Sequence, residues 1–101
     1  MAGSTFAEFV ARFWPPELID ELFLAEADAD WEAWDAFSQR HADRFVTDYA
    51  ASNPAEDLAE TFTAFVLDPR PTGATIADEK LRFLWNDPGM VELRSRIRAA
   101  L

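Results

Sequence analysis

The sequence contains no cysteine, and this absence removes several classes of site at once. Without cysteine the 101-residue chain has no disulfide, no thiolate metal ligand and no thiol nucleophile. It has a single histidine, His41, so a metal motif that needs two histidines is also absent. Cysteine usage therefore carries no information about the compartment in which the protein works.

Basic residues are scarce too. Nine Lys and Arg stand against nineteen Asp and Glu, which gives a formal net charge of −10, and residues 17–35 contain no Lys or Arg. Such a surface repels phosphate backbones and anionic lipid. No apolar run approaches the roughly 20 residues that span a bilayer. The sequence therefore disfavours nucleic-acid and membrane roles.

What the chain does have is a composition that folds. Half of its residues are apolar, and 14% are aromatic, which is enough to build one hydrophobic core in a chain of this length. We expect residues 5–101 to form a single helical domain. Residues 1–4 are interpreted as an added or disordered start.

The apolar residues recur at helical spacing and predict an all-α fold, a compact bundle of about five to six helices. Proline pairs and capping residues mark the boundaries, with Thr5 and Glu8 at capping-box spacing and Asp30 as a further cap. The expected helices cover residues 5–14, 16–27, 31–42, 54–67, 75–85 and 88–101. The stretch 45–52 is expected to be extended or irregular.

One segment carries more specific information. From Tyr49 to Phe62 the sequence has the pattern Y-x6-E-x-x-A-E-x-F. This pattern resembles the third-ligand segment of the gluzincin zinc metallopeptidases, the family that includes the catalytic domain of anthrax lethal factor and similar secreted bacterial peptidases. The resemblance assigns the third zinc ligand to Glu56 and the oxyanion-stabilising hydroxyl to Tyr49. Glu60, or as second choice Asp57, would orient the metal ligands through hydrogen bonds without touching the metal itself.

The same resemblance requires two histidines and a glutamate on an earlier helix. At the expected position the first helix has Ala7, Glu8 and Ala11, so the general-base position holds glutamate and both histidine positions hold alanine. Because one carboxylate cannot hold catalytic zinc, the resemblance implies a metallopeptidase-like domain that is inactive and binds no zinc tightly. The family's zinc, its peptide substrates, its secreted location and the likeness to the helical half of its catalytic domain rest on the resemblance alone.

The residues also allow simpler interpretations. Glu56 after Asn53 fits an ordinary capping box, and Tyr49 fits a half-buried tyrosine with its hydroxyl at the surface. The main alternative function is a non-enzymatic acidic helical interaction module. Its acidic second and third helices would engage a basic or apolar partner. The stripe of Trp31, Trp34 and Phe37 is expected to lie in the core, and any part of it left uncovered would bind a partner or favour self-association.

Overall fold

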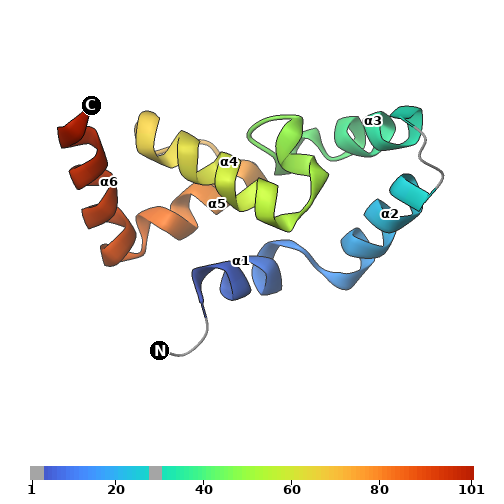
Figure 1. Cartoon of the computed structure of the whole chain (residues 1–101), viewed down its shortest axis with the longest axis horizontal. Helices are drawn as coiled ribbons and strands as arrows, with labels where there is room; N and C mark the ends of the chain where they lie inside the picture. Colours follow the sequence, from blue (N-terminus) through green and yellow to red (C-terminus); the bar gives the residue numbers. More distant parts are fainter. Residues whose placement is uncertain (1–3, 28–30) are drawn as a thin grey trace.

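Helix boundaries follow the capping residues and prolines of the sequence. The computed structural model describes residues 4–27 and 31–101. In these residues it contains helices and no strand, and none of the helices has the length and apolar character to cross a bilayer. The helices are α1 (Thr5–Phe13), α2 (Pro16–Ala27), α3 (Trp31–Arg40), α4 (Pro54–Leu67), α5 (Ile76–Trp85) and α6 (Pro88–Ala100), with short 3-10 helices η1 (Ala42–Arg44) and η2 (Tyr49–Ser52) (Figure 1). The predicted all-α bundle of five to six helices is confirmed.

Side-chain caps explain most of these boundaries. Asn53 accepts a hydrogen bond from the Glu56 backbone N–H at 2.8 Å and starts α4, and Thr75 forms a reciprocal capping box with Asp78 at the start of α5.

Two expectations about the boundaries need correction. The cap of α1 is Ser4, whose hydroxyl accepts from the Ala7 N–H at 3.0 Å, so the helix starts one residue earlier than with the expected Thr5 cap and has a single side-chain cap in place of the expected box from Thr5 to Glu8. Serine is a slightly better N-cap than threonine, and with Ser4 in this position Thr5 enters the first turn. The stretch 45–52 ends in the helical turn η2. The expected cap Asp30 lies outside the described residues.

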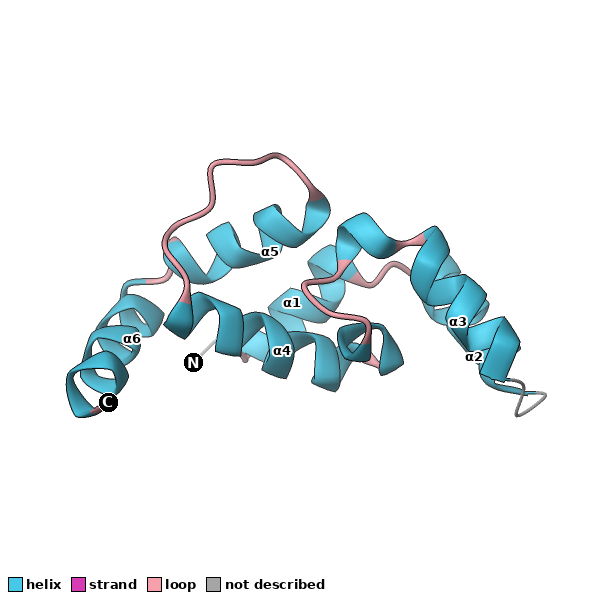
Figure 2. Cartoon of the chain, turned by 90° about the horizontal axis from the view of Figure 1, so that it is seen from above, coloured by secondary structure: helices cyan, strands magenta, loops and turns pink. Residues whose placement is uncertain are grey.

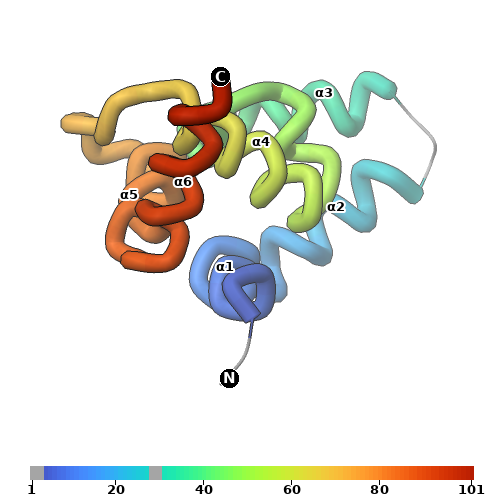
Figure 3. The backbone as a smooth tube through the Cα atoms, turned by 60° about the vertical axis from the view of Figure 1, so that its left-hand side comes forward, coloured from blue at the N-terminus to red at the C-terminus, as the bar shows by residue number. Residues whose placement is uncertain are grey.

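The helices form an elongated arch with extents of 44 × 29 × 25 Å. The antiparallel pair α2 and α3 lies at one end, α4 and α5 lie in the middle, and α6 lies at the other end (Figure 1). Seen from above, α1 lies between α4 and α5, and in the third view it runs below both (Figures 2 and 3). In this arrangement α4 and α5 contact each other, and each also contacts α1 and α6.

The core consists of two adjoining clusters. The first joins α1, α2, α3 and the 3-10 segments, and its buried members are Phe9, Phe13, Trp14, Leu18, Leu22, Ala25, Phe37, Phe45, Ala50 and Ala51. The second joins α4, α5 and α6 around Phe65, Val66 and Leu84. Leu58 and Phe83 pack against both clusters, so the apolar interior is continuous along the arch.

Candidate functional site

A buried ion pair lies where α4 and α5 face each other. The Lys80 ammonium lies 2.7 Å from an oxygen of the Asp57 carboxylate, and both side chains are fully shielded from solvent. Lys80 is the only lysine of the sequence. Charged residues are almost never buried unless they are paired, and here the single lysine is used inside the protein and not at its surface.

Neighbouring groups complete the hydrogen bonding of this pair. The Asp57 carboxylate also accepts from the Trp14 indole N–H at 2.9 Å and from the Thr61 hydroxyl at 3.2 Å, while Lys80 donates to the backbone carbonyl of Arg44. Burial raises the pKa of Asp57 and lowers the pKa of Lys80, and the attraction between the two charges opposes both shifts. Because solvent does not reach it, the pair serves to hold α1, α4 and α5 together and has no access to a substrate.

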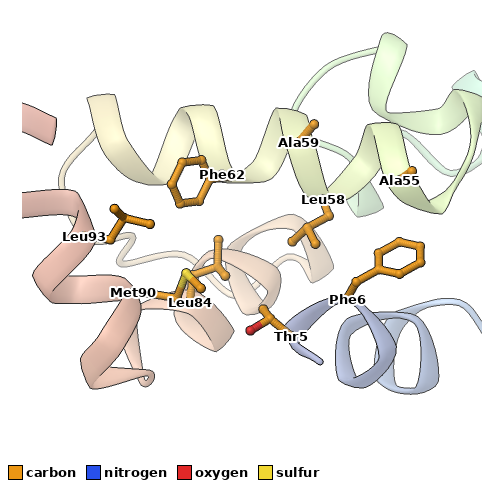
Figure 4. A pocket seen from close by; sticks show the side chains of 9 residues that line it. All are labelled: Thr5, Phe6, Ala55, Leu58, Ala59, Phe62, Leu84, Met90 and Leu93. Carbon is orange, nitrogen blue, oxygen red and sulfur yellow. The ribbon is translucent and has the colours of Figure 1, made fainter. Parts of the chain in front are cut away.

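A solvent-open apolar hollow lies on the other side of α4. It has a volume of about 420 Å³ and receives side chains from four helices (Figure 4). Its lining residues are Thr5, Phe6, Ala55, Leu58, Ala59, Phe62, Leu84, Met90 and Leu93. Apart from the Thr5 hydroxyl, no side chain in this lining carries a polar group. The alanines of α4 are small, and their size leaves room between α1 and α6.

A second apolar hollow continues the first along α4. It measures about 220 Å³ and is lined by Phe62, Thr63, Val66, Leu67, Ile97 and Leu101. The two hollows share Phe62. We call them together the α4 groove. It follows the fourteen residues of α4, a length of roughly 21 Å at the α-helical rise.

The far wall of the α4 groove is α6, which is held by arginines. Arg94 donates to the carbonyls of Phe65 at 2.7 Å and Asp68 at 3.0 Å, and its guanidinium lies 4.4 Å from the ring centre of Trp85. Arg98 donates to the carbonyl of Val66 at 2.8 Å. The last carbonyls of a helix lack partners within the helix, so these contacts both complete α4 and fix α6 beside it.

The residues suggested as a zinc site lie in different surroundings. Glu8 is exposed and borders a hollow that contains Arg12 and Phe83, while Glu60 borders another hollow and accepts a hydrogen bond from the Thr47 hydroxyl at 2.9 Å. Tyr49, on η2, is 57% exposed.

The remaining members of that set also serve other contacts. Glu56 is half-buried in the first turn of α4, where its backbone N–H is capped, and Asp57 belongs to the buried ion pair. Ala7 and Ala11 are exposed. At about 100° per residue they lie on the face of α1 opposite the buried Phe9. Among residues 4–27 and 31–101, no three His, Asp or Glu side chains form a group that could hold a metal ion.

Sequence reasoning missed Lys80 and the α4 groove. A signal for Lys80 existed, because Ile76, Lys80 and Leu84 follow one another at i, i+4 and i+8 and so share a helix face with apolar ends. The sequence contains no comparable signal for the α4 groove. The apolar periodicity that includes Phe6 or Leu93 identifies an apolar helix face, but it does not show whether another helix covers that face.

Comparison with known proteins gave no relative: no family model, no curated protein and no solved structure matches this chain. The fold and the contacts of the described residues are therefore the basis for any function.

Proposed function

We propose that this protein is a non-catalytic helical interaction domain that binds the apolar face of an amphipathic helix in the α4 groove. The observation that carries the proposal is the groove's lining, which is apolar except for Thr5 and Thr63 and is open to solvent. Grooves of this kind between helices are common sites for helical segments of partner proteins. Bonds are not made or broken in such a role, so it needs no nucleophile, base or metal.

The shape of the groove favours a helix over a compact small molecule. Two hollows in a row, joined at Phe62, fit side chains that recur every three or four residues along a helix. Met90 adds an unbranched, polarisable side chain that adapts to different apolar partners. Each leucine buried there contributes about 1.5–3 kcal/mol, so several anchors are needed to offset the cost of association.

The test uses a peptide of about fourteen residues, with leucine at positions i, i+3, i+4 and i+7 and glutamine elsewhere. The control peptide has the same composition in scrambled order. Binding is followed by fluorescence anisotropy with wild-type protein, with Ala59→Glu, which places a carboxylate in the groove, and with Ala36→Glu, which places one at an exposed position of α3.

We expect the ordered peptide to bind. Ala59→Glu should weaken binding at least about tenfold, because the bound peptide would cover an unpaired carboxylate, and this desolvation costs free energy. Ala36→Glu should bind as wild type does. Equal binding of ordered and scrambled peptides, or equal loss in both variants, contradicts the proposal. A dimer seen by light scattering and abolished by Ala59→Glu alone would show that a second copy fills the groove instead.

A relationship to the gluzincin metallopeptidases is a second proposal. It is supported by the pattern from Tyr49 to Phe62 and by the packing of α1 beside α4, since Phe6 and Leu58 line the same hollow. Zinc titration of an Ala7→His, Ala11→His variant tests it, with the wild-type chain as control. A gain of tight zinc binding through Glu56, lost again in Glu56→Gln, is the expected result. No gain would end the proposal and leave the groove unaffected.

A further inference from the structure

The end of the α2–α3 hairpin exposes large apolar side chains. Phe23 and Leu24 near the end of α2 are 68% and 74% exposed, and Trp31 at the start of α3 is 73% exposed. These three residues are called the distal end of the hairpin. In an antiparallel pair the end of one helix and the start of the next lie together, as Figure 1 shows. The inner faces of both helices, in contrast, are buried in the first core cluster.

The helices that carry these apolar side chains are acidic. The sequence contains no Lys or Arg between Arg12 and Arg40. On α2, Asp20 lies three and four residues before Phe23 and Leu24 and so shares their face. Arg40, in the last turn of α3, has its guanidinium 2.6 Å from the Glu21 carboxylate. It therefore lies at the opposite end of α3 from Trp31.

We propose that the distal end of the hairpin binds an arginine- or lysine-rich segment of a partner protein. Carboxylates such as Asp20 and Glu26 attract the cations, and the exposed rings offer faces to guanidinium groups and to the aliphatic parts of the basic side chains. Charge complementarity selects this occupant over nucleic acid or anionic lipid, which the net charge of −10 repels.

The body of the protein already contains this chemistry. Arg94 lies over Trp85 with 4.4 Å between guanidinium carbon and ring centre, and Arg12 lies 5.3 Å from the ring centre of Phe13. At the distal end the ring of Trp31 lies 5.1 Å from the ring of Trp34, centre to centre, and is otherwise 73% exposed, with no guanidinium over it among the described residues. An arginine of a bound basic segment would contact the Trp31 ring in the way that Arg94 contacts the ring of Trp85.

This surface is separate from the α4 groove. The groove is apolar and lined from α1, α4, α5 and α6, whereas the distal end belongs to α2 and α3. Binding at the two surfaces should therefore differ in its response to salt, because only the charged surface depends on screened attraction. The two proposals can fail independently.

The probe is a fluorescent peptide of alternating arginine and glycine, with a glutamine-for-arginine version as its control. Anisotropy is measured from about 50 to about 300 mM NaCl. One variant, Asp20→Asn with Glu26→Gln, removes two charges near the distal end, and a second, Phe23→Ser with Trp31→Ser, removes the rings. The matched control, Asp43→Asn with Glu79→Gln, removes two exposed charges from η1 and α5.

We expect the arginine peptide to bind in a salt-dependent manner, and both hairpin variants to bind it about three- to tenfold more weakly. The control variant should lose less than about twofold, because screening weakens distant charges. Ala59→Glu in the groove should not weaken this binding. If the hairpin variants and the control lose the same affinity for the peptide, binding depends only on the net charge of the protein, and the proposal is overturned. Circular dichroism verifies that each variant is folded.

Discussion

The two ends of the molecule are attached to its centre by different forces. The α2–α3 hairpin is held by side chains that are buried in the first core cluster, among them Leu18, Leu22 and Phe37. In α6, which the structure describes in full, no side chain is buried to that extent. Its partly buried Met90, Val91 and Ile97 pack against the second core cluster, and Arg94 and Arg98 add hydrogen bonds to carbonyls at the end of α4.

This difference bears on the two surfaces. Because the hairpin is held by its inner face, the residues on its outer face are not needed for stability. They can therefore form a charged surface that binds a partner. A helix held at its edge by arginines can form one wall of an open groove without closing it, as α6 does for the α4 groove. Between the two ends, the ion pair of Asp57 and Lys80 connects α4 with α5.

The largest effect is expected at the centre, because both ends depend on it. Asp57→Ala leaves the Lys80 ammonium buried without its partner and should lower the free energy of unfolding by about 3–5 kcal/mol. Urea denaturation followed by circular dichroism measures this loss. In Asp57→Leu with Lys80→Met no buried charge is left, so the loss should be smaller than in Asp57→Ala, and what remains is the cost of the Trp14 N–H and the Thr61 hydroxyl left without their acceptor. An equal loss in the double variant would mean that the ion pair is not the cause.

Next in size is the apolar attachment of the hairpin. Leu22→Ala opens a cavity in the first core cluster and should lower the free energy of unfolding by about 2–5 kcal/mol. The neighbouring Phe23→Ala removes an exposed ring and serves as control, with a change within about 0.5 kcal/mol. Similar losses at both positions would contradict the assignment of buried and exposed faces on α2.

The attachment of α6 should be weaker. Arg94→Met keeps an unbranched side chain but removes both hydrogen bonds to carbonyls and the cation over Trp85, at a cost of about 1–3 kcal/mol. The control is Arg96→Met, because the Arg96 ion pair with Glu92 is exposed and contributes about 0–1 kcal/mol. Hydrogen exchange should accelerate in α6 and remain unchanged in α2. If Arg94→Met costs more than Leu22→Ala, the comparison of the two ends is wrong.

The smallest effect concerns pH. The hydrogen bond from Arg40, assisted by His41, lowers the pKa of Glu21, so this carboxylate stabilises the folded state above its ordinary pKa of 4.5 and loses that contribution as the pH falls. The raised pKa of Asp57 acts in the opposite sense, since it favours the folded state at low pH.

Glu21→Gln should therefore flatten the loss of stability on acidification below about pH 4.5, with a difference of no more than about 1 kcal/mol at neutral pH. Urea midpoints from about pH 3 to about pH 7 give the comparison, with Glu26→Gln on the same helix as control. If stability depends on pH in the same way in Glu21→Gln and in wild type, Glu21 does not contribute to the acid sensitivity of the fold.

Local signals were sufficient to predict the helices. Asn53 and Pro54, or Thr75 with Asp78, act within one turn, so each boundary could be read from adjacent residues. The cap of α1 was misplaced by one residue because Ser4 and Thr5 have the same capping chemistry.

Contacts between distant residues were harder to predict. The ion pair joins residues 23 positions apart in the sequence, and the α4 groove depends on how far α6 stands from α1, which no local pattern encodes. The zinc-site pattern places Glu8 and Glu60 in one site, whereas in the structure they line separate hollows. A pattern of glutamates and alanines at helical spacing also arises in helices that share no site.

The most direct test of the central claim is a nuclear magnetic resonance titration of isotope-labelled protein with the leucine–glutamine peptide. The account predicts that the amide signals of Phe6, Ala59, Phe62 and Leu93 move together with one dissociation constant, and that those of the α2–α3 hairpin stay in place. Signals that move on α2 and α3 instead, or no movement at saturating peptide, would contradict the claim that the α4 groove is the binding site.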